Sequence, residues 1–416
     1  MKRNLIAIIN GTIITPQDII QNGAILIENQ RIKQVGSVRQ VIVPQDASKI
    51  DAKNQLVVPG FIDLHLQGSF GYDVWDLPSP KRSSGFAQAG ETETSLGTLS
   101  QKLLCGGTTS FLATTEYHQP TIKRLCRFIG NPKSEIRPDF AKASSGENPK
   151  LASCLGIHLE GPFINPERKG GIPQESIHKP SEKILDKVYK LTGGHLKMMT
   201  IAPELKNALP MIKNLVNNRI IASIGHTNAT FAEAKQGFAA GISHTTHLFN
   251  QITAIHHRSP GATLACLLDD RITVQIICDG IHLDWEIIKL IYKLKGSAQI
   301  ALITDAVRAA GLPDGIYYSQ GHGRKSIVKN GKVTRPDGTI AGSTLTMNRA
   351  VANAVNNGGI PLHDAVQMAT LTPAKILGLS HRIGSITPNK DADIIILDNQ
   401  FGVTQAIIKG VLAFSR

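Results

Sequence analysis

The stretch "FIDLHLQGSFGYD", residues 61–73, is the part of the sequence from which the fold is best argued. An apolar run at residues 57–64 leads to His65, at the place where a buried strand should end. Two residues later, where a metal site would have a second histidine, the chain has Gln67. Three interpretations are open: a metal site that lacks one ligand, a site that needs fewer metal ions, or an ordinary strand end.

Similar apolar runs recur along the chain, and stretches of helical character separate them. Strands that alternate with helices favour a parallel sheet, because a parallel pair of strands needs a crossover connection. Eight such runs are what a (β/α)8 barrel requires, so the sequence predicts an α/β fold of this TIM-type class. The runs are "LVVPGFIDLH", "TTSFLATT", "CLGIHLEGP", "LKMMTIAP", "IIASIGH", "SHTTHLF", "TVQIICDG" and "IALITDA".

The two ends of the chain have a different pattern of apolar and polar residues from the middle. Residues 1–58 alternate apolar and polar residues between Asn-Gly and Gly turn signals, and residues 383–416 return to strand patterns. We therefore predict a small β-sandwich domain formed by residues 1–58 and 383–416, beside a catalytic barrel of residues 59–382. Two polar, Pro/Gly/Ser-rich stretches, residues 76–95 and 130–150, read as surface loop insertions.

Composition limits the class of protein. The chain of 416 residues is 41% hydrophobic and 19% charged, so it can bury a sizeable core. Its net charge of +13 comes from scattered Lys and Arg residues without a basic block, which favours a surface that attracts small anions over nucleic acid or membrane partners. The five cysteines show no CxxC spacing, and no apolar run is long enough to cross a bilayer. We expect reduced thiols and a cytoplasmic location.

Metal ligands and acid/base groups gather at one kind of position. Each of five residues comes just after a predicted strand, where barrel enzymes keep their active sites. One carboxylate and two imidazoles among them make a three-ligand set for a catalytic divalent metal, with a position left for water. The five residues are Glu160, His226, His247, His282 and Asp305.

Three further features have weaker signals. His158 precedes Glu160 by two residues, so it points to the same face and could line the site or orient Glu160. Arg258, in "AIHHRSPG", suits a bidentate clamp on a phosphate or carboxylate, with a solvated loop arginine as the alternative. The segment "IAGSTLTM", residues 340–347, reads as a turn that opens a helix, with Ser343 or Thr344 as its N-cap.

Taken in order, these segments resemble the N-acetylglucosamine-6-phosphate deacetylases of the amidohydrolase superfamily. The resemblance covers nearly the whole chain apart from the two insertions. "LEGP", "GHTNAT" and "THLFN" in this order are specific to the family, whereas "PGFIDLH" and "DADIIILD" are shared across amidohydrolases. Other matching segments are "RSPG", "DGIHLD", "LITDAVRAAGLPDGIY", "IAGSTLTM" and "ATLTPAKILGL".

The resemblance implies roles for these positions. Glu160, His226 and His247 match the metal ligands of the family. Asp305 matches the aspartate that acts as general base and then as general acid, and His282 matches the histidine that helps to polarise the acetyl carbonyl. The phosphate-contacting positions match Asn250, the backbone at Gln251, and Arg258. The turn that lines the sugar pocket matches Ile340, Ala341 and Gly342.

The implied reaction is hydrolysis of the N-acetyl group of N-acetylglucosamine 6-phosphate, which gives glucosamine 6-phosphate and acetate. In some relatives the phosphate-binding arginine reaches across a dimer interface, so a homodimer is expected, with Arg258 serving the neighbouring subunit. The alternatives are another amidohydrolase that acts on a different N-acyl or cyclic amide, and a non-catalytic binding protein on the same fold.

The number of metal ions follows from Gln67. In two-metal amidohydrolases a His-x-His pair at this strand end helps to hold a second ion, and here Gln67 replaces the second histidine. An amide oxygen is a poor ligand for zinc beside imidazole or carboxylate. We therefore expect one divalent ion, zinc, with Fe²⁺ or another divalent ion as the alternative. A weak second ion shared by His65 and Asp305 is the other possibility.

Overall fold

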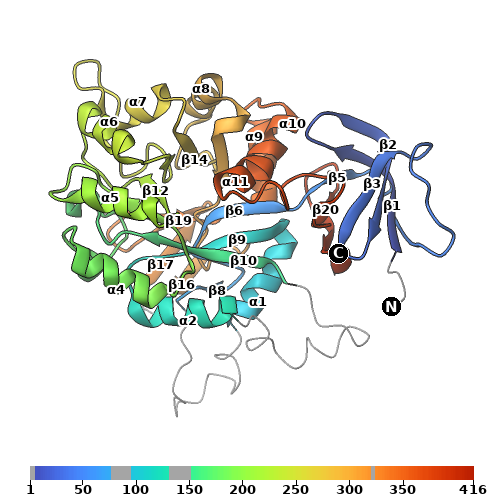
Figure 1. Cartoon of the computed structure of the whole chain (residues 1–416), viewed down its shortest axis with the longest axis horizontal. Coiled ribbons are helices and arrows are strands. Elements are labelled where there is room, and N and C mark those ends of the chain that lie inside the picture. The colour runs from blue at the N-terminus through green and yellow to red at the C-terminus, as the bar shows by residue number, and fades with distance from the viewer. Residues whose placement is uncertain (1–4, 76–94, 131–150, 320–323) are drawn as a thin grey trace, which may run out of the picture.

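The computed structural model describes residues 5–75, 95–130, 151–319 and 324–416. Its centre is a barrel of parallel strands, with helices around it, and a separate sheet lies at one side (Figure 1). The first and last described strands, β1 and β22, both lie in that separate sheet.

The barrel contains eight parallel strands in the order β15-β14-β13-β12-β11-β10-β9-β6. It closes where the Asp305 backbone N–H donates to the His65 carbonyl at 2.9 Å, so the last strand meets the first. Every strand coincides to within one residue with part of one of the eight predicted apolar runs, and the predicted barrel is confirmed. The strands are β6 (Phe61–Leu66), β9 (Thr108–Thr115), β10 (Ser153–Glu160), β11 (Leu196–Ile201), β12 (Ile221–Ile224), β13 (His244–Thr245), β14 (Thr273–Ile277) and β15 (Ile300–Ile303).

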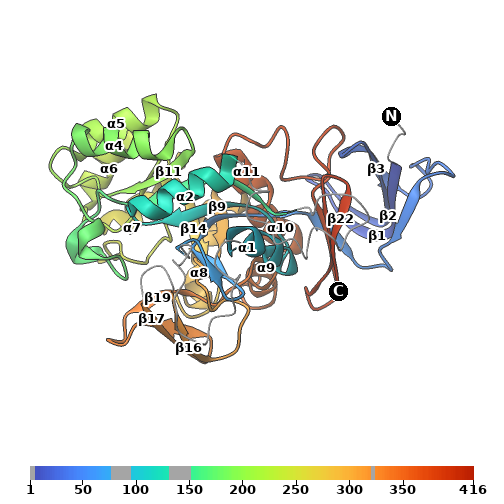
Figure 2. The same ribbon diagram turned by 90° about the horizontal axis from the view of Figure 1, so that it is seen from below.

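Helices connect the strands and cover the barrel (Figures 1 and 2). Their inward faces are apolar; in α4, for example, Leu185 and Val188 are buried one turn apart. The helices are α1 (Ser95–Lys102), α2 (Gln119–Gly130), α4 (Glu182–Thr192), α5 (Ala208–Asn217), α6 (Phe231–Ala240), α7 (Gly261–Leu268), α8 (Trp285–Lys295), α9 (Met347–Asn356), α10 (Leu362–Ala369) and α11 (Leu371–Ile376). Short 3-10 turns are η1 (Leu103–Gly106), η3 (Pro166–Arg168), η4 (Gln174–Ser176) and η5 (Ser297–Gln299).

The chain ends form the second sheet, in the order β22-β21-β20-β5-β1-β2-β3, with β4 beside β1. In β20, Ile394 and Ile396 pack into the core of this sheet, whereas Ile395 and Leu397 pack into the barrel core, so one strand joins the two units. A domain division at residues 58 and 383 stays a prediction. The strands are β1 (Leu5–Ile14), β2 (Ile19–Glu28), β3 (Arg31–Ser37), β4 (Ser48–Asp51), β5 (Leu56–Pro59), β20 (Ile394–Leu397), β21 (Val403–Ile408) and β22 (Val411–Ser415).

The run "LVVPGFIDLH", expected as one strand, is two strands that belong to different sheets. β5 ends at Pro59 and pairs with β1 and β20, whereas β6 begins at Phe61 and pairs with β9. Gly60 separates them, and a β-carbon there would lie 2.1 Å from Thr109 Oγ1. The chain can therefore pass from one sheet to the other only because this position has no side chain.

A four-stranded antiparallel sheet within the barrel segment was not predicted. It consists of β16 (Gly315–Tyr318), β17 (Lys325–Lys329), β18 (Lys332–Thr334) and β19 (Ile340–Ser343), and Figure 2 shows it on the opposite side of the barrel from α5 and α6. The expected N-cap at Ser343 or Thr344 was wrong, because residues 340–343 are strand β19 and α9 begins at Met347. The Ser343 hydroxyl instead donates to the Thr304 carbonyl and ties this sheet to the end of β15.

A short hairpin of β7 (Gly68–Ser69) and β8 (Tyr72–Asp73) follows β6. The predicted insertions at residues 76–95 and 130–150 lie outside the described residues, except for Ser95 and Gly130 at their edges. Within the described ranges, no helix has the length and apolar character needed to span a membrane.

Candidate active site

The expected site residues meet at the carboxyl ends of the barrel strands. Glu160 is the last residue of β10, His226 and His247 follow β12 and β13, and Asp305 follows β15. His226, His247 and Asp305 have φ angles of 48°, 27° and 46°, in the left-handed region that L-residues seldom adopt. Such strain persists only where the surroundings impose it, which is typical of functional positions.

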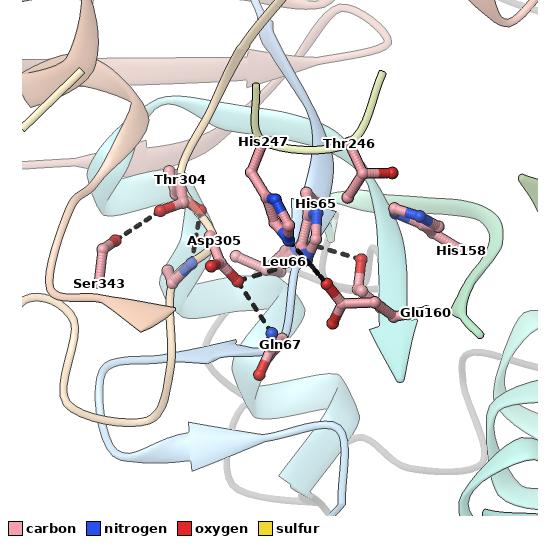
Figure 3. A network of polar contacts seen from close by, with 12 residues as sticks. His65, Leu66, Gln67, His158, Glu160, Thr246, His247, Thr304, Asp305 and Ser343 are labelled. Carbon is pink, nitrogen blue, oxygen red and sulfur yellow. Dashed lines mark hydrogen bonds and ion pairs between the residues drawn. The ribbon is translucent and has the colours of Figure 1, made fainter. Parts of the chain in front are cut away.

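Glu160, His226 and His247 form a compact group of possible metal ligands. Glu160 Oε1 lies 2.8 Å from His226 Nε2 and 3.0 Å from His247 Nε2, and the two Nε2 atoms are 3.1 Å apart. All three side chains are buried. Figure 3 shows Glu160 and His247 pointing toward each other, although β11 and β12 separate the strands that carry them.

The protonation of the two imidazoles tests whether these residues suit a metal. His226 Nδ1 donates to the Arg168 carbonyl at 2.6 Å, and His247 Nδ1 donates to the Asn250 carbonyl at 3.1 Å, because a carbonyl can only accept. In the neutral rings, each Nε2 therefore presents a lone pair to the other and to the Glu160 carboxylate. A shared cation satisfies such an arrangement, and backbone carbonyls that fix the ligand tautomer are the usual support of a metal site. The residues fit a divalent ion.

Asp305 lies beside this group, and its surroundings change the pKa of its carboxyl group. Its Oδ1 accepts a hydrogen bond from Gln67 Nε2 at 2.8 Å and lies 3.3 Å from His65 Nε2 (Figure 3). Burial raises the pKa of Asp305 well above its ordinary value, and the charge of Glu160 raises it further. Asp305 is therefore a carboxyl group suited to hold a proton, the property that a general acid/base needs.

His65 and His158 lie behind these groups. Burial lowers the pKa of His65 well below its ordinary value, and its Nε2 lies 3.7 Å from Glu160 Oε1. Both ring nitrogens of His158 have partners, with Nε2 2.9 Å from Thr200 Oγ1 and Nδ1 3.3 Å from the Leu64 carbonyl. Neither of these contacts involves Glu160, and the two roles considered for His158 stay predictions. His65 lies close enough to Asp305 for the predicted weak second ion, and that prediction stays open.

His282 is held by a neighbouring carboxylate. Its Nδ1 lies 2.7 Å from Asp279 Oδ2, and Asp279 Oδ1 also accepts the backbone N–H groups of Ile281 and His282. Burial is the largest single influence and opposes the charged form of Asp279, but the hydrogen bonds from His282 and Ile281 and the charge of His282 together outweigh it, so the pKa of Asp279 is lowered. The carboxylate thus fixes the ring and can stabilise a positive charge on it.

The site opens into a cavity of about 380 Å³. Its lining includes Glu160, His226, His247, His282 and Asp305 together with most of the expected substrate-contacting positions, Asn250, Gln251, Ile340, Ala341 and Gly342. Arg258 does not line the cavity of its own chain. It is exposed, and its guanidinium donates to His257 Nε2 at 2.7 Å.

Comparison with known proteins places this site in a family. The sequence profile of the amidohydrolase family matches residues 56–413. The chain belongs to the amidohydrolase family. An N-acetylglucosamine-6-phosphate deacetylase of Bacillus subtilis is 34% identical over 97% of this amidohydrolase and 95% of the relative. An N-acetylgalactosamine-6-phosphate deacetylase of Escherichia coli O157:H7 is 31% identical over 93% of this chain and 95% of the relative.

The fold of this amidohydrolase is also similar to that of a solved deacetylase structure. The crystal structure of N-acetylglucosamine-6-phosphate deacetylase from Pasteurella multocida is 29% identical to this amidohydrolase, with a TM-score of 0.85. The match covers 99% of this chain and 100% of that chain. The resemblance identified from the sequence motifs is confirmed.

Several residues near the active site of this amidohydrolase, some of which line its cavity, were not expected from the sequence. Glu116 and Arg324 form an ion pair at 2.9 Å at its wall, and Arg335 lines it from the turn before β19. Asp279 was missed as the partner of His282, although its position three residues earlier in "DGIH" was a usable signal. The two arginines had no such signal, because neither follows a barrel strand.

Proposed function

We propose that this amidohydrolase removes the acetyl group of N-acetylglucosamine 6-phosphate by hydrolysis, giving glucosamine 6-phosphate and acetate. The observation that carries the proposal is the buried Glu160–His226–His247 group with Asp305 beside it at the floor of one cavity. The full-length match to deacetylases of 6-phosphorylated amino sugars supports the same substrate class.

Glu160, His226 and His247 would hold one divalent ion. Zinc is the proposed metal, because one carboxylate and two imidazoles with an open position are typical of catalytic zinc sites. The same donors also accept Fe²⁺ and other divalent ions. When bound, such an ion supplies positive charge and lowers the pKa of a water molecule.

Asp305 takes the proton of the attacking water and delivers it to the departing nitrogen. Its raised pKa lets the carboxyl group keep the proton between these two steps. The Gln67 amide donates a hydrogen bond to the Asp305 carboxyl group and holds it from one side, which fixes its position relative to the metal ligands.

His282 donates a hydrogen bond to the acetyl carbonyl oxygen as negative charge develops there. Its Nδ1 is committed to Asp279, so donation from Nε2 requires a positive ring, and the Asp279 carboxylate stabilises that form. The substrate is positioned by Asn250 and the backbone at Gln251, which contact the phosphate, and by Ile340, Ala341 and Gly342, which line the sugar pocket.

We propose a homodimer in which Arg258 completes the phosphate site of the neighbouring subunit. The exposed position of Arg258, outside the cavity of its own chain, supports this arrangement. Hybrid dimers of an Arg258→Ala chain and an Asp305→Asn chain, isolated with two affinity tags, test it. If Arg258 acts across the interface, the Arg258→Ala homodimer loses activity on the phosphorylated sugar, whereas the hybrid keeps one intact site and about half of the wild-type activity. A hybrid as impaired as the Arg258→Ala homodimer would place Arg258 within the site of its own subunit, and an unimpaired Arg258→Ala homodimer would place Arg258 outside the site.

A cytoplasmic location is also proposed. All five cysteines are free thiols, which suits a reducing compartment. Fractionation of cells with an antibody to the chain checks this location.

The deciding experiment compares kcat/KM for N-acetylglucosamine 6-phosphate and for N-acetylglucosamine on zinc-loaded protein. A preference of about a hundredfold or more for the phosphorylated sugar is expected, roughly the effect of one charged clamp. Activity without this preference would indicate that the substrate is another N-acyl compound, and inactivity on both sugars would reject the proposal. N-acetylgalactosamine 6-phosphate, assayed in parallel, defines the tolerance for the epimer.

A further inference from the structure

We propose that Arg335 is a second phosphate-binding residue of the cavity, contributed by the same chain as Asp305. This inference rests on the proposed function, because it assigns the phosphate of that substrate to a further residue. It predicts that the phosphate is contacted by cations from two sides, Arg335 from this chain and Arg258 from the neighbour.

The position of Arg335 is set by a hairpin that also lines the cavity. Arg335 follows β18, its backbone N–H donates to the Thr339 carbonyl at 2.8 Å, and its carbonyl accepts the Gly338 N–H at 3.0 Å. These bonds close the turn that leads into β19, whose first residues are the sugar-pocket positions Ile340 and Ala341. Arg335 is therefore anchored at the edge of the proposed sugar pocket.

Two glycines connect Arg335 with the proposed phosphate contacts. A β-carbon at Gly171 would lie 3.8 Å from Arg335 Nε, and a β-carbon at Gly170 would lie 3.2 Å from Gln251 Cγ. The guanidinium and the Gln251 side chain thus pack against successive residues of one loop, and all four residues line the cavity. An anion bound at the Asn250–Gln251 turn lies on the same side of the cavity as Arg335.

The charges in the cavity wall leave Arg335 available for an anion. Of the two arginines in the lining, Arg324 is paired with the buried carboxylate of Glu116 at 2.9 Å. The Arg335 side chain is half-buried and forms no ion pair or hydrogen bond within the described parts of the chain. Burial lowers the pKa of Arg335, and the nearby charge of Arg324 lowers it further. A partly desolvated cation without a partner is costly, and a bound phosphate removes that cost.

The test uses Arg335→Gln and Arg335→Lys in the full-length, zinc-loaded protein. Arg335→Gln is expected to lower kcat/KM for N-acetylglucosamine 6-phosphate by about 10- to 100-fold, mainly through KM, because bidentate contact with the phosphate is lost. Its activity on N-acetylglucosamine should stay within about twofold of wild type, since that substrate has no phosphate to lose. Arg335→Lys keeps the positive charge but lacks the paired N–H donors of the guanidinium, so we expect a loss of kcat/KM that is smaller than in Arg335→Gln. Arg349→Gln, at an exposed position of α9, is the matched control.

Inorganic phosphate gives a second readout that does not depend on turnover of the sugar. Its competitive inhibition constant should rise in Arg335→Gln by about the same factor as KM for the phosphorylated sugar. Equal losses on both sugars, or an unchanged preference for the phosphorylated one, would overturn the inference. Wild-type protein that deacetylates neither sugar would instead reject the proposed function, so the two failures are distinguishable.

Discussion

At the scale of single residues, Asp305 combines burial, a hydrogen bond from Gln67 and proximity to the Glu160 carboxylate. These surroundings raise the pKa of Asp305 well above its ordinary value, so the group can accept a proton and return it. The residue that carries the proton in the proposed reaction is thus defined by its neighbours, not by its position in a motif.

Asp305→Asn is expected to lower kcat by about a thousandfold, within the range usual for loss of a general acid/base, while the sugar phosphate still binds. Stopped assays give kcat, and calorimetric titration with N-acetylglucosamine 6-phosphate gives the affinity. Asp46→Asn, at an exposed position, serves as the control for the charge change. Near-normal kcat in Asp305→Asn would remove Asp305 from the mechanism.

Gln67 gives a test of how many metal ions the site holds. Its amide donates to Asp305 and offers no good ligand for a second ion, so purified protein should contain one tightly held ion per chain. Gln67→His restores a His-x-His pair with His65 and should raise the content toward two ions, whereas Gln67→Ala should stay at one. Elemental analysis after dialysis measures this. Two retained ions in the wild type would show that Gln67 does not prevent a second site.

At the scale of elements, the junction between β5 and β6 depends on one missing side chain. A β-carbon at Gly60 would meet Thr109 of β9 at 2.1 Å from Oγ1, so Gly60→Ala forces the first barrel strand away from its neighbour. We expect a loss of about 1–3 kcal/mol in the free energy of unfolding, the usual effect of overpacking. Denaturant titration measures it.

Gly130→Ala is the matched control, because a β-carbon there would have no neighbour within 4 Å among the residues that the structure describes. A loss in Gly60→Ala no larger than in Gly130→Ala would mean that the junction can relax around the added methyl group.

The elements differ in how well the sequence predicted them. The barrel strands are continuous apolar runs because parallel strands are buried on both faces, and this pattern is visible locally. β16–β19 have three to five residues each and are largely half-buried or exposed, so they lack such a run. The segment at residues 340–343 was therefore interpreted as a helix start, although its pairing partner is β18.

At the scale of the whole molecule, buried neutral histidines connect stability with pH. Burial lowers the pKa of both His158 and His244 to about 3, far below the value of an unfolded histidine. Because the folded-state pKa is depressed, the unfolded state binds more protons at low pH. The stabilisation is present above about pH 6.5 and is lost as the pH falls toward 3.

The free energy of unfolding of the wild type should fall between pH 7.5 and pH 5.0, because buried imidazoles gain protons on unfolding. In His244→Gln this fall should be smaller by about 2 kcal/mol, because one such imidazole is gone. Urea titrations at both pH values measure the difference, which is independent of any constant effect of the substitution. His381→Gln, at an exposed position, should leave the pH dependence unchanged. Equal pH dependence in wild type and His244→Gln would show that His244 is not the titrating group.

The sequence by itself determined the eight barrel strands and the polar residues that follow them, Glu160, His226, His247 and Asp305 among them. These features are local: an apolar run marks a buried strand, and parallel strands of a barrel bring their carboxyl ends together. Motif order alone was sufficient to identify the family.

Only the tertiary structure decided which other side chains reach the cavity. Arg258, although it follows a barrel strand in sequence, lies exposed outside it, whereas Arg335 enters it from a hairpin far along the chain. Likewise, the tautomer of His226 is set by the Arg168 carbonyl, which the fold brings from a different loop. Such contacts depend on the paths of loops and on barrel closure, which join residues distant in sequence, and no local pattern records them.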